Sequence, residues 1–284
     1  MNLSAAVIQM VSGPDVDENL ERAAALIADA TSMGAELVVL PETFACFSTR
    51  LQKPLAQEAL ANANHGRVHQ FLSAQAEQHN IWLVGGTVPE FSMERMSQEN
   101  PFTTSIVYSP KGQRVASYHK VHLFDVDVAD AQGSYRESDT YAAGSEVIAT
   151  GIETADGSTT LGLSVCYDLR FPELYRLLAL KGAAVVSVPA AFTKKTGDAH
   201  WQLLLRARAV ENQCFMIGAN QGGQHGPSRQ TSGGSCIVSP WGDVLAEVDY
   251  GEGVAVAELD LSQCKDLQSR MPVFQHRRFF LKDE

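Results

Sequence analysis

Short apolar runs alternate with segments of helical periodicity along this chain, and this alternation constrains the fold more than any other feature. Apolar runs of about four to eight residues suit buried strands, whereas apolar residues spaced by about three or four suit helices packed on a sheet. The first half reads strand, helix, strand, helix, strand over residues 3–9, 16–33, 36–41, 68–79 and 81–88. The second half repeats this order over residues 161–165, 172–181, 184–189, 199–212 and 214–219. The sequence therefore predicts an α/β fold.

Two turn sequences indicate that the sheets are mixed and not purely parallel. Ser109–Gly112 joins the strand-like runs 104–108 and 114–119, and residues 240–243 read Pro-Trp-Gly-Asp. Both are typical of antiparallel hairpins. The chain has no internal repeat, low-complexity tract or Pro/Ser-rich linker, so we expect a single domain over residues 1–284.

The charge balance excludes some classes of partner. The chain has 33 acidic residues against 22 Lys and Arg, and its formal charge is -11. Such a chain repels phosphate backbones and anionic lipids, so we expect neither nucleic acid nor membrane as a partner. Apolar runs such as 37–40 and 183–186 are far shorter than the roughly 20 residues that cross a bilayer. A secretory signal begins with basic residues, but the first basic residue of this chain is Arg22. We therefore expect no secretory signal and a cytoplasmic location.

One of the five cysteines has surroundings that suit chemistry. The cysteines are odd in number and form no C-x-x-C, which argues against a disulfide framework or a zinc ribbon. Cys166 follows the strand 161–165 and precedes a helix, and the helix dipole there would favour a thiolate. The alternative is a buried structural cysteine. Cys214 and Cys236 lie in apolar strand patterns and are expected in the core, whereas Cys46 lies close enough to Glu42 in sequence to line the same cavity.

Two charged residues stand at the ends of predicted strands. Glu42 directly follows an apolar strand, so its carboxylate is placed either to act as a general base in a cavity or to lie on the surface. Lys120 ends a strand, and a buried ammonium there needs an acidic partner such as Glu42 or Glu137. His119 and His122 are spaced to face opposite sides of a strand, so no metal site is expected. The polar connection 122–146 is unusually long and favours an active-site loop or lid.

Three separated segments resemble the Glu, Lys and Cys motifs of the nitrilase superfamily of carbon-nitrogen hydrolases. They are Leu40–Phe44, Tyr118–Phe124 and Ser164–Glu173, and weaker matches extend the resemblance over nearly the whole chain. The resemblance implies a four-layer α-β-β-α sandwich of two mixed sheets flanked by helices. It also implies a homodimer or larger homo-oligomer, and neither a metal nor an organic cofactor.

The resemblance further implies a role for each motif residue. Glu42 would take the proton of Cys166, whose thiolate would attack an amide and form a thioester. Lys120 and the backbone N–H of Tyr167 would stabilise the oxyanion, a contribution of about 3 kcal/mol per donor. Glu137 would help to place Lys120 and the substrate.

Within this family, residues 272–278 and the motif around Cys166 resemble the Nit branch. Members of that branch cleave deaminated glutathione, a small-molecule amide, to 2-oxoglutarate and cysteinylglycine. Arg170 would bind the α-keto acid carboxylate, or would instead pair with Asp168 or Glu173. Phe192 and Thr196, in the loop after the strand 184–189, would line the acyl pocket.

Two other readings stay open at this stage. The first keeps the enzyme class and changes the substrate, giving an omega-amidase that acts on 2-oxoglutaramate or another small-amide or carbamoyl hydrolase. The second changes the class, giving a catalytically silent binding protein of this fold or a thiol redox protein that uses Cys166 with peroxide. The presence of Glu42, Lys120 and Cys166 together argues against a silent protein.

Overall fold

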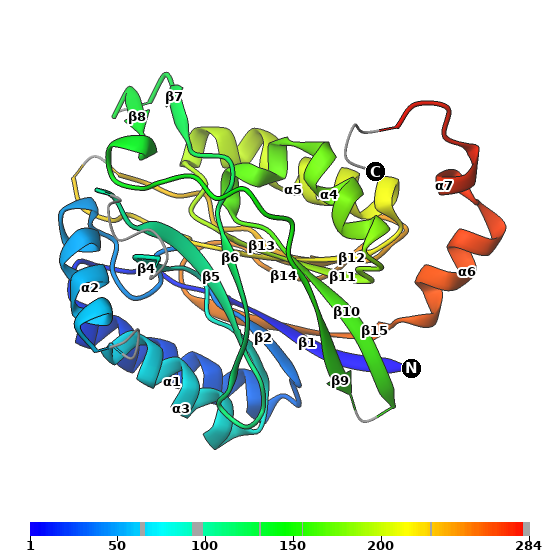
Figure 1. The fold of residues 1–284 in the computed structure, drawn as a ribbon, viewed down its shortest axis with the longest axis horizontal. Coiled ribbons are helices and arrows are strands. Elements are labelled where there is room, and N and C mark those ends of the chain that lie inside the picture. The colour runs from blue at the N-terminus through cyan, green and yellow to red at the C-terminus, as the bar shows by residue number, and fades with distance from the viewer. Residues whose placement is uncertain (63–65, 93–98, 131, 155, 228, 281–284) are drawn as a thin grey trace.

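The computed structural model describes residues 1–62, 66–92, 99–130, 132–154, 156–227 and 229–280. These residues form two large mixed sheets packed face to face, with helices on the outer face of each (Figure 1). The predicted four-layer sandwich is therefore confirmed.

The first sheet contains the N-terminal strands. Its order is β15 (Gly253–Asp260), β1 (Asn2–Gln9), β2 (Leu37–Val39), β3 (Trp82–Val84), β5 (Phe102–Tyr108) and β4 (Val88–Glu90), with β6 (Arg114–His119) paired to β5. β1, β2 and β3 are parallel, and the β5–β6 hairpin is antiparallel. Helices α1 (Val16–Ser32) and α3 (Arg67–His79) cover its outer face.

β1 shows why this sheet is buried on both faces. Successive side chains of a strand point to opposite sides. Leu3 and Val7 belong to the core between the two sheets, whereas Ala6 and Ile8 belong to the core under α1 and α3. A strand that is apolar on both faces can only lie inside a layered structure.

The second sheet contains the later strands. Its order is β14 (Val244–Val248), β13 (Ser235–Val238), β12 (Phe215–Asn220), β11 (Val185–Ala190), β10 (Gly157–Leu163) and β9 (Ala149–Thr154). Helices α4 (Pro172–Leu180) and α5 (Lys194–Asn212) cover its outer face.

β15 connects the two halves of the chain. It follows β14 of the second sheet in sequence, but it pairs antiparallel with β1 of the first sheet from Asn2↔Asp260 to Gln9↔Gly253. The sequence analysis did not predict this strand. Because the two ends of the chain share one sheet, we infer that the chain forms the single domain expected.

The sequence analysis missed several local elements. Helix α2 (Thr49–Ala61) was not expected, and the connection 122–146 contains a hairpin of β7 (Asp125–Asp127) and β8 (Ser134–Arg136), with Ala131 outside the described residues. A 3₁₀ helix, Glu137–Asp139, follows this hairpin.

Two helix boundaries near the predicted site also differ. α5 begins at Lys194 and not at residue 199, because the Thr193 side chain caps it by accepting from the N–H of Thr196. Thr196 therefore lies in the first turn of α5 and not in a loop. Cys166 does not open an α-helix either, since Cys166–Arg170 is a separate 3₁₀ helix before α4.

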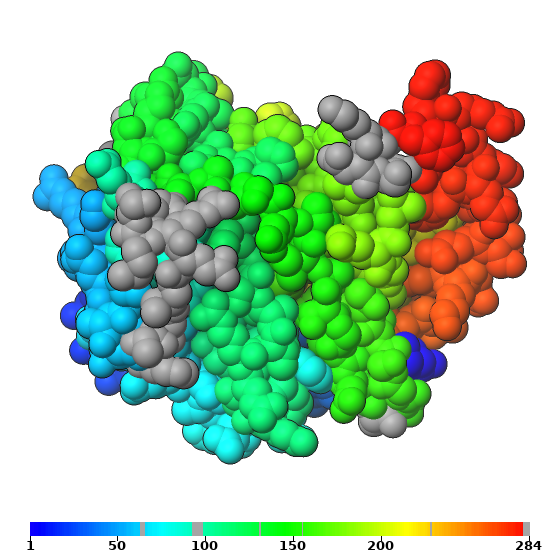
Figure 2. All heavy atoms as spheres, in the orientation of Figure 1, coloured from blue at the N-terminus to red at the C-terminus, as the bar shows by residue number. Residues whose placement is uncertain are grey.

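The C-terminal part leaves the sandwich. α6 (Ser262–Arg270) and α7 (Val273–His276) extend from the end of β15 at the right edge of the view (Figures 1 and 2). Within the described ranges, no helix combines the length and apolar character that a membrane span requires.

Candidate active site

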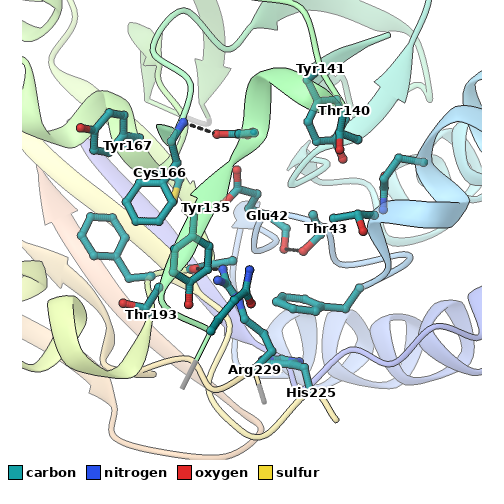
Figure 3. Close-up of a pocket in the computed structure, with 18 of the residues that line it drawn as sticks. Glu42, Thr43, Tyr135, Thr140, Tyr141, Cys166, Tyr167, Thr193, His225 and Arg229 are labelled. Atoms are coloured by element: carbon teal, nitrogen blue, oxygen red, sulfur yellow. Dashed lines mark hydrogen bonds between the residues drawn. The ribbon is translucent and has the colours of Figure 1, made fainter. Parts of the chain in front are cut away.

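The three candidate catalytic residues line one cavity of about 650 Å³. Glu42 follows β2, Lys120 follows β6, and Cys166 begins the 3₁₀ helix that follows β10. Figure 3 shows Glu42 and Cys166 around this cavity. All three are buried, with exposed fractions of 6%, 1% and 7%. Segments that are remote in sequence therefore meet at one site.

Lys120 lies between two carboxylates. Its Nζ donates to Glu42 Oε1 at 2.9 Å and to both carboxylate oxygens of Glu137 at 2.8 Å. Burial alone would lower the pKa of this ammonium, but the charges of Glu137 and Glu42 outweigh burial and hold the pKa well above its usual value. Lys120 is therefore charged at neutral pH.

Glu137 is fixed by a second donor. The backbone N–H of Phe124 donates to Glu137 Oε2 at 2.6 Å. Burial and the charge of Glu42 raise the pKa of Glu137, whereas Lys120 opposes the rise. The predicted proximity of Glu137 to Lys120 is therefore present in the structure, where Glu137 begins the 3₁₀ helix after β8.

The Cys166 thiol is neutral in the resting site. Burial, and next the nearby charge of Glu42, raise its pKa well above the usual value, and Lys120 only partly offsets this. The sequence analysis predicted the opposite direction from a helix dipole. The difference arises because the thiol is enclosed and faces a carboxylate. A base must therefore remove its proton when substrate is bound.

Asp168 holds the backbone around Cys166. It is fully buried, and its Oδ2 accepts from the Tyr118 hydroxyl at 2.8 Å and from the backbone N–H of Val165 at 2.9 Å. Its Oδ1 accepts from the backbone N–H and Nδ1 of His122, at 3.0 and 2.7 Å. Tyr118 and His122 flank Lys120, so one carboxylate fixes the Lys120 segment against the Cys166 segment.

Cys166 itself has a strained backbone. Its φ is +49°, in the left-handed region that non-glycine residues rarely adopt. Such a residue persists only when its surroundings fix it, and the hydrogen bond from Val165 to Asp168 does so on one side. Tyr167 is the second residue of this 3₁₀ helix, where a backbone N–H has no acceptor within the helix.

The predicted substrate-binding residues differ in whether they line the cavity. Phe192 and Thr196 line the cavity, and so does Tyr167, which was predicted to stabilise the oxyanion. Arg170 is not among its lining residues. Its guanidinium lies 5.3 Å from the Phe192 ring centre, and its Nη1 lies 3.3 Å from His200 Nδ1. The placement of Arg170 thus gives no support to direct substrate contact.

Nor does Arg170 form the predicted alternative ion pairs. Within the described residues it makes no salt bridge, and the Asp168 carboxylate is occupied by the donors described above. Cys46 is buried and its Sγ contacts the carbonyl oxygen of Pro14 at 3.4 Å. It does not line the cavity, and burial raises its pKa, so it is a core residue.

The sequence analysis missed several lining residues that come from long connections. They are Phe47, Tyr135, Tyr141, His225 and Arg229. The signal that would have pointed to Arg229 is the length of the glycine-rich connection between β12 and β13, since long ordered connections are often functional.

A metal centre finds no support in the part of the chain that the structure describes, where no cluster of three or more His, Cys, Asp or Glu residues is arranged to hold a metal ion. His119 Nδ1 contacts Thr104 Oγ1 at 2.9 Å, and His122 Nδ1 donates to Asp168. Each of these histidines thus has a partner other than a metal.

Comparison with known proteins adds to this geometry. The sequence matches the family described as Carbon-nitrogen hydrolase over residues 4–269. A Synechocystis protein named deaminated glutathione amidase is 42% identical over 275 residues, which cover 97% of this chain and 98% of that protein. A Yersinia enterocolitica protein of the same name is 38% identical over 278 residues, covering 98% and 94%. The crystal structure of Saccharomyces cerevisiae Nit3, a member of branch 10 of the nitrilase superfamily, matches with a TM-score of 0.83 at 34% identity, covering 98% of this chain and 97% of Nit3.

Proposed function

This chain belongs to the carbon-nitrogen hydrolase family, and we propose that it hydrolyses the amide of deaminated glutathione to 2-oxoglutarate and cysteinylglycine. The two relatives described above are named for this activity. The observation that carries the proposal is the buried Lys120 ammonium, held between Glu42 and Glu137 beside the Cys166 thiol.

Attack on the amide begins with a proton transfer. Glu42 takes the proton from Cys166, and the sulfur forms a bond to the carbonyl carbon of the bound amide. The carbonyl oxygen becomes an oxyanion, which the Lys120 ammonium and the Tyr167 N–H stabilise. A donor aimed at such an oxyanion contributes about 3 to 4 kcal/mol to the transition state.

The charge of Glu42 explains how Lys120 becomes available to the oxyanion. In the resting site, the Lys120 ammonium donates to Glu42 and to both oxygens of Glu137. Once Glu42 is protonated, its attraction for Lys120 weakens while a new negative charge forms on the substrate oxygen. Glu42 loses its negative charge as the substrate oxygen gains one, so the total charge around Lys120 stays constant. The surrounding groups therefore need little rearrangement during this step.

The intermediate then collapses to a thioester. The carbon-nitrogen bond breaks, and protonated Glu42 gives its proton to the departing amine of cysteinylglycine. A water molecule enters, Glu42 takes one of its protons, and the hydroxide attacks the thioester carbon. The carbon-sulfur bond breaks, the proton returns to Cys166, and 2-oxoglutarate leaves.

Assembly and location are further parts of the proposal. We expect a homodimer or a larger homo-oligomer, as the family resemblance implies. We expect a cytoplasmic location, and the five free cysteines support it, because thiols stay reduced in that compartment.

The test compares two substrates in the purified wild-type protein. Deaminated glutathione and 2-oxoglutaramate share the acyl group and differ in the leaving group. The proposal predicts the higher kcat/KM for deaminated glutathione, and a clear preference for 2-oxoglutaramate would contradict it. Cys166→Ser and Glu42→Gln should each remove hydrolysis, whereas a redox protein would keep its reaction with peroxide in Glu42→Gln.

A further inference from the structure

The catalytic end of the cavity offers no net positive charge to an anionic substrate. One ammonium is shared there by two carboxylates, so the cluster of Lys120, Glu42 and Glu137 carries a net negative charge. A substrate that carries carboxylates needs cations in another part of the cavity. The arginines that line the cavity are Arg50, Arg136 and Arg229.

Two of these arginines are poorly placed to hold a ligand. Arg136 already donates to Asp127 Oδ1 at 3.0 Å and to the carbonyl oxygen of Tyr135 at 2.7 Å. Arg50 is exposed on α2, where a long side chain has many rotamers to lose on binding. Arg229 is the arginine with a fixed position and an uncommitted charge.

The position of Arg229 is set by neutral groups. Its guanidinium lies 4.7 Å from the Tyr135 ring centre and 5.7 Å from the Phe47 ring centre, and Nη2 donates to the carbonyl oxygen of Ala191 at 3.3 Å. Arg229 and Tyr135 lie together at the cavity in Figure 3. In the described part of the chain, Arg229 forms no salt bridge. Its guanidinium is therefore oriented before a ligand arrives.

Asp130 is the carboxylate that competes for this charge, and it has other donors. Its Oδ1 accepts from the N–H groups of Gln132 and Gly133 at 3.0 and 2.9 Å, and its Oδ2 accepts from the Tyr135 hydroxyl at 2.8 Å. Asp130 lies near enough for its charge to interact with Arg229. It thus supports the Tyr135 ring that faces Arg229 without occupying the guanidinium.

Arg229 lies close to the nucleophile and is more exposed to solvent than the nucleophile is. The backbone of Ala191, whose carbonyl accepts from Arg229, also contacts the Cys166 sulfur. Cys166 is 7% exposed, whereas Arg229 is half-buried, so the guanidinium is nearer to solvent than the sulfur is. The acyl group stays bonded to sulfur while the amine departs and water enters, so the leaving group must occupy the side open to solvent.

We propose that Arg229 binds the carboxylate at the far end of the cysteinylglycine leaving group. This inference rests on the proposed function and adds a residue that selects between its substrates. A guanidinium pairs with a carboxylate through two parallel hydrogen bonds, which suits a peptide C-terminus. An amide that releases ammonia has no such carboxylate and gains nothing from Arg229.

The experiment measures kcat and KM for Arg229→Gln, Arg229→Lys and wild type on three substrates. They are deaminated glutathione, its glycinamide analogue without the leaving-group carboxylate, and 2-oxoglutaramate. We expect Arg229→Gln to lower kcat/KM for deaminated glutathione about 10- to 100-fold, chiefly through KM, because a hydrogen-bonded charge pair is lost. Arg229→Lys should recover part of the loss.

Two comparisons separate binding from structural damage. The other two substrates should change less than about threefold in Arg229→Gln, and their turnover shows that the variant is folded. Removing the leaving-group carboxylate should have the same effect as removing Arg229. In wild type, kcat/KM should therefore fall from deaminated glutathione to its glycinamide analogue by the factor that Arg229→Gln loses on deaminated glutathione. Arg270→Gln removes an equal charge from exposed α6 and should match wild type on all three.

Failure of this inference and failure of the proposed function give different results. If Arg229→Gln slows all three substrates equally, or slows none, the assignment of Arg229 is wrong while the proposed function stands. If wild type hydrolyses 2-oxoglutaramate and not deaminated glutathione, the proposed function is wrong, and the assignment of Arg229 fails with it.

Discussion

Asp168→Asn tests whether one buried carboxylate holds the site together. Asn keeps the shape of Asp but replaces one carboxylate oxygen by an NH₂ group, which cannot accept a hydrogen bond. Because each oxygen of Asp168 accepts from two donors, the NH₂ group meets two donors in either orientation of the amide. Two of the four donors around residue 168 then lose their acceptor, either those of Tyr118 and Val165 or the two of His122. A hydrogen bond to a buried charged group contributes about 1.5 to 3 kcal/mol, so the free energy of unfolding should fall by about 3 to 6 kcal/mol.

The same substitution should also reduce turnover. Cys166 keeps its left-handed φ only while its neighbours are fixed, and Val165 is held through Asp168. We expect kcat of the folded variant to fall at least about tenfold, because a misplaced nucleophile loses its attack geometry. Urea unfolding followed by circular dichroism measures the stability, and kcat is measured under conditions where the variant is folded.

Two further variants make the outcome interpretable. Tyr118→Phe removes only one donor to Asp168 and should cost about 1.5 to 3 kcal/mol, so it remains foldable if Asp168→Asn does not. Glu173→Gln neutralises an exposed carboxylate near the same motif and should match wild type. If Asp168→Asn unfolds within about 0.5 kcal/mol of wild type and keeps full kcat, Asp168 does not position Cys166, and the reasoning is refuted.

Two other predictions follow from buried carboxylates. Glu137→Gln leaves Lys120 with one charged partner and should lower kcat about 10- to 100-fold, with a smaller change in KM. Steady-state kinetics measures both constants, and an unchanged kcat would contradict the role of Glu137. Burial opposes ionisation of Glu90, but His69 and Arg114 lower its pKa from 4.5 to about 2. The ionised carboxylate therefore stabilises the fold above about pH 4.5, and this stabilisation is lost as the pH falls toward 2. Glu90→Gln should therefore cost about 3 kcal/mol in urea unfolding at pH 7, and the difference from wild type should shrink on acidification; a difference that does not depend on pH would be evidence against this ion pair.

The sequence predicted the parts of the site that depend on local order. Glu42, Lys120 and Cys166 each follow a strand, and strands with strong apolar patterns can be recognised without knowing their partners. Their meeting in one cavity followed from the family resemblance, and the structure brings them together. Their catalytic roles, and that of Glu137, remain proposals.

Features that depend on partners remote in sequence were missed. β15 pairs with β1 across almost the whole chain, and no local pattern identifies such a pairing. The predicted direction of the shift in the Cys166 pKa was wrong for the same reason. The shift depends on burial of the thiol and on the charge of Glu42, which is remote in sequence. Arg170 follows the Cys166 motif and Arg229 lies in a glycine-rich connection, and only the folded paths of these segments decide which arginine lines the cavity.

The most direct test of the account is the mass of the intact protein, quenched in acid during turnover of deaminated glutathione. The account predicts an added mass equal to one 2-oxoglutaryl group, located by peptide mapping on Cys166, and no such addition in Cys166→Ser. Wild-type protein that hydrolyses this substrate without any acyl group on Cys166, or with the group on another residue, would contradict it.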